Sequence, residues 1–292
     1  MNHEKVPVVN VLKVGRYRML ERLGDGASGA VYLAEDTVIR RKVALKLFRQ
    51  QEADARALRN FEREAQCASL LNHPNIVTLF DVGVEDDVRY IASEYVEGET
   101  LRELLQNGPL PIIDAIDIAL GVASALVAAH EAWVVHRDVK PENIMLRRDR
   151  CVKVLDFGVA KLAGGGEQTD PLKRGHKLVG TLPYLSPEQV RGEPIIDTRS
   201  DIYSLGVVMY EMLAGVPPFT GATPIDVLAA IVEAEVPPLP GSVPAAIAEL
   251  VMGCLRKAVH ERVQTAAEVV AQLSDVRLDF AIRERTSRLA VN

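Results

Sequence analysis

The sequence predicts an α+β protein in which a small strand-rich region precedes a larger helix-rich region. From residue 17 to residue 97, short β-branched and aliphatic runs are separated by turn residues and interrupted by one helical pattern. After Gly98 the hydrophobic period is mainly helical. The chain has 292 residues, enough for two such regions with a core in each.

The strands of the first region are short apolar runs bounded by turn residues. The single helix expected there, Glu52–Leu71, lacks Gly and Pro and ends before the turn Asn72-His73-Pro74. We predict five strands in this region, namely Tyr17–Leu23, Ala30–Asp36, Arg41–Phe48, Ile76–Val82 and Val88–Glu94.

Helices dominate the second region. The apolar stretch Ile118–Ala129 has only twelve residues and polar neighbours, so we predict a helix buried on all sides and no membrane span. The segment Val276–Leu289 is expected to form a solvated C-terminal helix. The other predicted helices are Thr100–Gln106, Ile112–Glu131, Asp201–Leu213, Pro224–Ala234, Pro244–Arg256 and Thr265–Val276.

The composition argues against several classes of protein. A net charge of −6 disfavours nucleic acid as a partner, because sequence-independent binding needs a basic surface. The N-terminal apolar run is interrupted by Pro7 and Asn10 and makes a poor signal peptide. The three cysteines, Cys67, Cys151 and Cys254, are scattered without metal-ligand spacing. We therefore expect a cytoplasmic protein with reduced thiols.

A glycine-rich turn lies between the first two predicted strands, with glycines at positions 24, 26 and 29. Glycines at such positions let backbone amides approach phosphate oxygens. The same spacing occurs in plain glycine turns and in dinucleotide-binding folds. A dinucleotide-binding fold needs a helix after the last glycine, whereas Val31 leads into a strand. The pattern favours a phosphate-binding turn between two strands.

The third predicted strand carries a lysine on a face with room for a flat ring. The strand period of two places Lys46 beside the small Ala44, whereas Val43 and Leu45 point to the other face. Glu64 lies on the apolar face of the predicted helix, and a carboxylate there needs a cationic partner. We predict a Lys46–Glu64 ion pair in preference to a solvated lysine on an edge strand.

Two polar motifs lie close together in the second region. Residues 136–143 read His-Arg-Asp-Val-Lys-Pro-Glu-Asn and contain a candidate base, Asp138, and a nearby cation, Lys140. Asn143 and Asp156 are candidate oxygen ligands for a metal. Transfer of a nucleotide phosphate to a hydroxyl needs about this set, because most of the work is positioning and charge neutralisation.

The segment between the two motifs predicts a β-hairpin. Ile144–Leu146 and Val152–Leu155 are apolar strands joined by a charged turn, residues 147–150. Such a hairpin would hold both candidate metal ligands at one end.

Together these motifs resemble the Hanks-type (eukaryotic-like) serine/threonine protein kinases, in particular their bacterial members. The resemblance runs from Tyr17 to Val276. It rests on the glycine turn, Val43-Ala-Leu-Lys46, His136-Arg-Asp138, Asp156-Phe-Gly158 and Ser186-Pro-Glu188.

The resemblance implies the bilobal protein-kinase fold and its domain plan. A β-rich N-lobe with one helix would span residues 17–93, a hinge 94–97 and an α-helical C-lobe 98–276. Residues 1–16 would be an N-terminal extension and 277–292 a C-terminal helical tail. The implied activity is transfer of the ATP γ-phosphate to Ser and Thr hydroxyls of proteins, with autophosphorylation.

The resemblance also implies roles for individual residues. Asp138 would orient the substrate hydroxyl, Lys140 would steady the γ-phosphate, and Thr181 would bond to both. Asn143 and Asp156 would bind Mg²⁺, with Mn²⁺ as an alternative. The implied catalytic set is Asp138, Lys46, Glu64, Lys140, Asn143 and Thr181. The implied nucleotide-binding set is Leu23, Gly24, Asp25, Gly26, Ala27, Ser28, Gly29, Ala30, Val31, Ala44, Lys46, Ser93, Glu94 and Val96.

Two structural roles follow from the same resemblance. Arg262 would pair with Glu188. Asp201 would be a buried acid that braces the catalytic loop, the motif at residues 136–143.

One departure from the family pattern is Ser93, just before the predicted hinge, where a larger apolar residue is usual. A small residue there predicts a pocket deep enough for inhibitors that carry bulky aryl groups. The alternative is that packing of neighbouring residues fills the space.

Another departure lies between Asp156 and Glu188, a segment that relatives commonly phosphorylate. Arg137 resembles an arginine that binds such a phosphate. The hydroxyl residues in the segment are Thr169, Thr181 and Ser186. We predict that Thr169 is autophosphorylated, or that Glu167 and Asp170 partly replace a phosphate. A disordered loop without a switch is the alternative.

Other classes of function share parts of this pattern. A nucleotide-binding pseudokinase or scaffold would be expected to lack one of the catalytic residues, and none is missing. A small-molecule phosphotransferase would share the mechanism but would not need the protein-substrate-binding segment implied by the resemblance, which contains Gly180-Thr181 and Ser186-Pro-Glu188. With no membrane span expected, we expect regulation by a partner, by dimerisation through the N-lobe or by a neighbouring segment.

Overall fold

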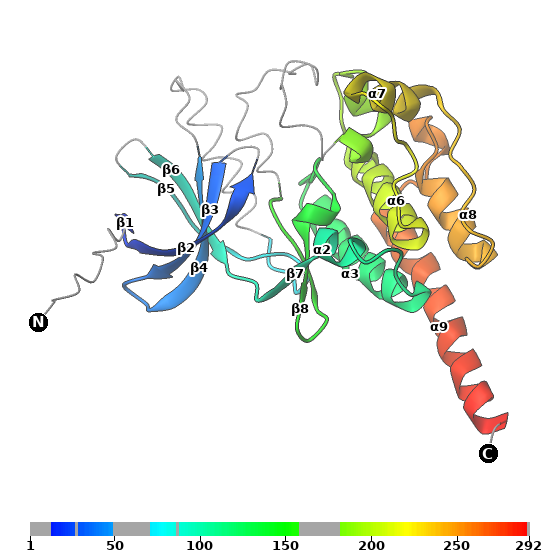
Figure 1. Ribbon diagram of the computed structural model, residues 1–292, viewed down its shortest axis with the longest axis horizontal. Helices are drawn as coiled ribbons and strands as arrows, with labels where there is room; N and C mark the ends of the chain where they lie inside the picture. The colour runs from blue at the N-terminus through cyan, green and yellow to red at the C-terminus, as the bar shows by residue number, and fades with distance from the viewer. Residues whose placement is uncertain (1–12, 27–28, 49–70, 86–87, 158–181, 291–292) are drawn as a thin grey trace, which may run out of the picture. The chain divides into compact units, whose positions relative to one another are not determined.

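The structure, a computed structural model, describes residues 13–26, 29–48, 71–85, 88–157 and 182–290 (Figure 1). The described residues form two compact units. Unit 1 contains residues 13–48 and 78–95, and unit 2 contains residues 71–77 and 96–290. Each unit has its own sheet and its own apolar core, which confirms the predicted α+β class.

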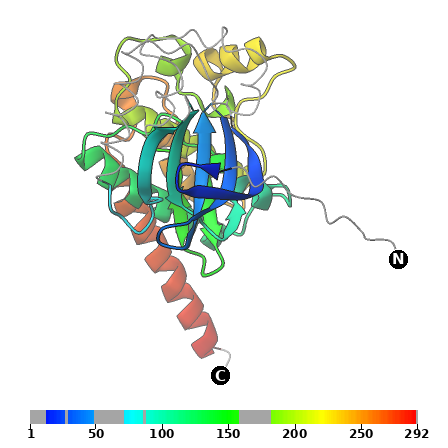
Figure 2. The ribbon, with the colours of Figure 1, turned by 90° about the vertical axis from the view of Figure 1, so that its left-hand side faces the viewer.

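Unit 1 is a six-stranded antiparallel sheet in the order β1-β2-β3-β4-β6-β5 (Figure 2). One face carries the core, where Tyr17, Val43 and Leu45 are fully buried. The short β1 was not predicted. The strands are β1 Lys13–Val14, β2 Tyr17–Gly26, β3 Gly29–Asp36, β4 Arg41–Phe48, β5 Leu79–Glu85 and β6 Val88–Glu94.

The predicted strand Ile76–Val82 is wrong at both ends. Strand β5 begins at Leu79 and continues to Glu85, whereas Ile76 makes only an isolated parallel bridge with Val154. The N–H of Val77 donates to the carbonyl of Val154, so residues 76 and 77 pair with a strand of unit 2. An apolar run alone could not show that it would be divided between two sheets.

Unit 2 combines a three-stranded sheet with packed helices. The sheet has the order β7-β8-β9, from Gly98–Thr100, Ile144–Arg147 and Val152–Val154. Strands β8 and β9 confirm the predicted hairpin, and β7 was not predicted. The helices are α2 Leu101–Leu105, α3 Ile112–Glu131, α5 Pro187–Val190, α6 Thr198–Ala214, α7 Pro224–Glu233, α8 Ala245–Cys254 and α9 Ala266–Ala290. The 3₁₀ turns are η1 Pro141–Asn143, η3 Leu182–Tyr184 and η4 Val259–Glu261.

Helix α6 is the most buried helix of unit 2, and every residue from Ser200 to Leu213 is buried. Asp197 caps its start by accepting the N–H of Arg199. Gly215 ends the helix at φ 80°, a left-handed conformation that glycine adopts without steric strain. A fully buried helix gives the polar side chains on it a rigid support.

Helix α3 has the length and hydropathy of a membrane span. Every residue from 118 to 129 is buried or half-buried in the core of unit 2, which agrees with the predicted core helix. Gly121 lets β9 approach closely, because a Cβ there would lie 2.7 Å from the Cβ of Val152. We therefore assign α3 to the domain core.

Helix α9 replaces the two C-terminal helices that we predicted to meet at Val276. It runs without a break from Ala266 to Ala290, and Figure 1 shows its last turns extending beyond the other helices of unit 2. The sequence of α9 contains no Gly or Pro to interrupt it. Phe280 packs partly on the core and Arg277 pairs with Asp117 of α3, so the helix is docked and not only solvated.

Candidate active site

In unit 1, four of the predicted nucleotide-binding residues share one face of three neighbouring strands. Val31 is the cross-strand partner of Lys46, and Ala44 is the partner of Ser93. These side chains are half-buried, whereas Val43 and Leu45 are fully buried on the opposite face. The predicted division of β4 into two faces is therefore confirmed. Ser93 Oγ donates to the carbonyl of Ala44 at 3.4 Å.

The glycine turn joins β2 to β3 as predicted. Gly24, Asp25 and Gly26 end β2, and Gly29 begins β3 as the partner of Gly26. A Cβ on Gly29 would lie 1.8 Å from the carbonyl oxygen of Leu47. The third glycine is therefore required by close packing of β3 on β4, in addition to any access that it gives to phosphate. Ala27 and Ser28 lie outside the described residues.

The remaining nucleotide-binding predictions fall at strand ends or near them. Leu23 is 44% exposed on β2, and Ala30 is half-buried on β3. The N–H of Glu94 donates to the carbonyl of Thr78 at 2.8 Å, so a backbone bond from Glu94 to adenine would use its C=O. Val96 is buried in unit 2.

The catalytic loop of unit 2 brings three predicted residues together. Lys140 Nζ lies 2.9 Å and 2.8 Å from the two carboxylate oxygens of Asp138. Asn143 Nδ2 donates to the backbone carbonyl of Asp138 at 2.8 Å and to its Oδ2 at 3.0 Å. The Asp138 side chain is 24% exposed, so an incoming hydroxyl can reach it. This arrangement holds one carboxylate in a defined orientation beside a cation.

The hairpin places both candidate metal ligands at one end, as predicted. Asn143 directly precedes β8, and Asp156 follows β9 by two residues. The Leu155 N–H donates to the carbonyl of Asn143 at 2.8 Å and closes this end. Because Asn143 binds Asp138 through Nδ2, its Oδ1 remains the atom suited to a metal. A carboxylate and an amide oxygen are ligands that Mg²⁺ accepts, so these residues fit a divalent cation.

A buried carboxylate on α6 supports the catalytic loop. Asp201 is fully buried and accepts the backbone N–H groups of His136 and Arg137 at 2.8 and 2.7 Å. Arg137 has φ 66°, a strained conformation for a large side chain. Asp201 therefore stabilises the left-handed backbone just before Asp138, which confirms the predicted brace. His130, for which we predicted no role, also contacts this carboxylate, and its Nε2 lies 2.9 Å from Asp201 Oδ2.

His136 links the catalytic loop to the second motif. Its Nε2 lies 2.7 Å from the carbonyl oxygen of Leu155, and its ring meets that of Phe157 edge-on at 4.6 Å. His136 is fully buried. Packing and hydrogen bonding thus account for this histidine, and neither contact involves a reacting group.

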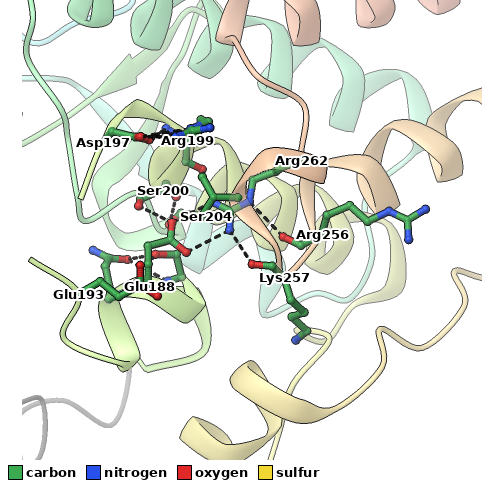
Figure 3. A network of polar contacts seen from close by, with 12 residues as sticks. Glu188, Glu193, Asp197, Arg199, Ser200, Ser204, Arg256, Lys257 and Arg262 are labelled. Atoms are coloured by element: carbon green, nitrogen blue, oxygen red, sulfur yellow. Dashed lines mark hydrogen bonds and ion pairs between the residues drawn. The ribbon is translucent and has the colours of Figure 1, made fainter. Parts of the chain in front are cut away.

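The predicted pair between Glu188 and Arg262 is present and buried (Figure 3). Arg262 donates to the two oxygens of Glu188 at 2.9 and 3.0 Å, and Ser200 donates to the same carboxylate at 2.5 Å. Burial by itself would raise the pKa of Glu188, but the hydrogen bonds and charge of Arg262 outweigh it and lower that pKa. The pair ties α5 to the loop before α9.

Several predictions fall on residues outside the described ranges. Glu64, the proposed partner of Lys46, is one of them, and so are Gly158, Thr169 and Thr181. Their proposed roles therefore stay predictions from the sequence. Gln189, for which we predicted no role, donates from Nε2 to the carbonyl of Arg137 at 3.0 Å.

Comparison with known proteins is consistent with this geometry. Residues 17–273 match the model of the protein kinase domain. A probable serine/threonine-protein kinase of Clostridium acetobutylicum is 39% identical over 94% of the chain and 42% of its own length. The serine/threonine-protein kinase PrkC of Bacillus subtilis is 40% identical over 89% of the chain and 40% of its own length. The serine/threonine-protein kinase PknB of Mycolicibacterium smegmatis is 41% identical over 94% of the chain and 46% of its own length.

The chain thus spans less than half the length of these curated relatives. The match to the family model covers most of the chain and includes the glycine turn, the catalytic loop and the hairpin that follows it. The chain belongs to the protein kinase domain family.

Proposed function

We propose that this chain is an ATP-dependent serine/threonine protein kinase. It transfers the γ-phosphate of ATP to Ser or Thr hydroxyls of protein substrates and also phosphorylates itself. The observation that carries the proposal is the cluster of Asp138, Lys140 and Asn143, in which a partly exposed carboxylate is held by a lysine and an amide. The named activities of the bacterial relatives support the same function.

Each residue of the cluster has a distinct task in this reaction. Asp138 orients the attacking hydroxyl and accepts its proton as the new P–O bond forms. The bond from the γ-phosphorus to the β,γ-bridging oxygen breaks at the same time, and ADP leaves. Lys140 offsets negative charge that accumulates on the transferred phosphoryl group. A divalent cation on Asn143 and Asp156 would neutralise charge on the ATP phosphates. Lys46, on β4 of unit 1, binds the α- and β-phosphates.

A pseudokinase or scaffold is a weaker proposal. That function does not need phosphoryl transfer, so loss of a catalytic residue would be expected. The sequence retains Lys46, Glu64, Asp138, Asn143 and Asp156.

The test of the proposed function is incubation of the chain with γ-labelled ATP, Mg²⁺ and a general protein substrate, followed by mapping of labelled residues. We expect label on Ser or Thr of both proteins, including Thr169 of the kinase itself. A parallel reaction with Mn²⁺ tests the alternative metal. ATP binding without any transfer of label would contradict the proposal. Full activity with an unlabelled Thr169 would contradict only the switch.

We propose that Ser93 controls access to the space behind the nucleotide site. Ser93→Met should weaken binding of an ATP-site inhibitor with a bulky aryl group by about 1–3 kcal/mol, because the larger side chain fills the space beside Ala44. Isothermal titration gives the affinities, and Ser93→Ala, which keeps the space, is the control. Equal affinity of wild type and Ser93→Met for that inhibitor would contradict the proposed role of Ser93 in controlling access.

We also propose a cytoplasmic location, where ATP is abundant, and a homodimer formed through unit 1. Apolar side chains exposed on unit 1 support the second proposal, among them Leu20, Val38 and Ile39. Analytical ultracentrifugation over a range of concentrations tests it. A single monomeric species throughout would exclude the homodimer.

A further inference from the structure

A second charged network lies beside the catalytic loop and centres on Arg102 of α2. Arg102 Nε donates to Glu142 at 2.8 Å, and Nη1 donates to Glu211 at 2.7 Å. Its Nη2 donates to the hydroxyl of Tyr184, which in turn donates to Glu211 at 2.5 Å. Burial by itself would lower the pKa of Arg102, but the hydrogen bonds that it donates to Glu211 and Glu142 raise it. One guanidinium thus binds three side chains.

The partners of Arg102 come from three different elements of unit 2. Glu142 lies in η1, between Lys140 and Asn143 of the catalytic loop. Tyr184 ends η3, three residues after Thr181. Glu211 lies on the buried helix α6. Arg102 therefore joins the catalytic loop to the segment after Thr181, with α6 as the rigid support.

Two of the four residues in this network are buried and two are partly exposed. Tyr184 and Glu211 are 3% and 4% exposed, so their hydrogen bond holds η3 on α6 without help from solvent-exposed groups. Arg102 and Glu142 are 32% and 37% exposed. Among the described residues, the guanidinium of Arg102 thus links the buried pair of Tyr184 and Glu211 to the surface of the catalytic loop. A planar group with five N–H donors can make these bonds at once, whereas a lysine cannot.

We infer that Arg102 is a positioning residue for the protein substrate, holding the segment after Thr181 in register with Asp138. The inference rests on the proposed kinase function, in which the segment after Thr181 lies beside the incoming Ser or Thr. Arg102 does not touch the reacting atoms. It acts through Glu142 on the catalytic loop and through Tyr184 on the substrate-binding segment.

This role predicts a selective defect. In Arg102→Met, the carboxylate of Glu142 loses its link to Tyr184 and Glu211, and the two segments are free to shift relative to each other. Because misplacement of a substrate by about 1 Å can reduce rates up to about 100-fold, kcat/KM for a peptide substrate should fall about tenfold or more. Hydrolysis of ATP by water does not use the substrate-binding segment, so that rate and the KM for ATP should be unchanged.

The experiment compares the intact wild-type chain with Arg102→Met and Arg102→Lys. Peptide phosphorylation, ATP hydrolysis without peptide and thermal unfolding are measured for each. Arg102→Lys should recover only part of the peptide activity, because an ammonium cannot reproduce three bonds in one plane. The matched control is Arg277→Met, which removes an exposed arginine of α9 that pairs with Asp117 of α3. All three readouts should stay near wild type in this variant.

The outcomes separate this role from a general structural one. A loss of peptide phosphorylation with unchanged ATP hydrolysis supports the positioning role. Unchanged peptide phosphorylation in Arg102→Met, or an equal fall in both reactions, would overturn it while the wild type remains a kinase. Absence of peptide phosphorylation by the wild type would overturn the proposed function itself, and with it this role of Arg102.

Discussion

Asp138→Asn is expected to reduce kcat for phosphoryl transfer by about 10²–10⁴-fold, the contribution that a positioned general base commonly makes. The asparagine can still accept a hydrogen bond from Lys140 or Asn143, so the loop should keep its conformation. What it loses is the negative charge that orients the substrate hydroxyl and accepts its proton. Single-turnover phosphorylation with γ-labelled ATP measures the loss. Affinity for ATP, measured by titration, should change little.

The control for this variant is Asp149→Asn. Asp149 lies on the turn between β8 and β9, is 55% exposed and pairs only with nearby Arg147 among the ion pairs described. Its replacement removes the same charge from the same unit and should leave kcat close to the wild-type value. Retention of more than about one tenth of wild-type kcat by Asp138→Asn would contradict the role given to that carboxylate.

Arg262→Met is expected to lower the free energy of unfolding by about 3–5 kcal/mol. The reason is that the carboxylate of Glu188, itself 3% exposed, would remain in the core without its cation. Urea unfolding of the intact chain measures the change. Arg277→Met, which breaks an exposed ion pair, should change the free energy by at most about 1 kcal/mol. A similar effect of both variants would contradict the importance of the buried pair.

The same pair predicts a pH dependence of stability. The native structure lowers the pKa of Glu188 below its ordinary value of 4.5, so folding favours the ionised form. Its contribution to the free energy of unfolding is therefore complete above about pH 4.5 and is lost as the pH falls through the lowered pKa. In Glu188→Gln, the free energy of unfolding should fall less on acidification, because this contribution is absent. Identical acid titrations of wild type and Glu188→Gln would show that the pair does not produce it.

Local patterns predicted the parts of the site that depend on neighbours in sequence. The alternation in β4 placed Lys46 and Ala44 opposite the buried Val43 and Leu45, because a strand has a period of two. The hairpin between the two polar motifs could be predicted because it too depends on residues that are close in sequence. Asn143 and Asp156 therefore come to one end of it. The ion pair of Glu188 with Arg262 was expected only from the resemblance to a family, since 74 positions separate the two residues.

Contacts between distant segments could not be predicted in this way. Arg102 and Glu211 are 109 positions apart, and nothing in the local pattern of either one indicates the other. Helix α9 was divided wrongly at Val276, where no Gly or Pro interrupts it. Its contact with α3 through Arg277 and Asp117 joins segments 160 positions apart, which no local pattern indicates. The same holds for Ile76, whose backbone neighbour Val77 pairs with β9 instead of extending β5.

The sequence by itself determined the fold class, the glycine turn, the two polar motifs and their family resemblance, because each depends on residue type and short-range spacing. Tertiary structure alone decided which distant groups support them. Asp201 and Glu211 both lie on the buried helix α6, from which they reach the backbone before Asp138 and the guanidinium of Arg102. A buried charge is stable only with a partner within a few ångströms, and the packing of the helices determines which residue lies that close.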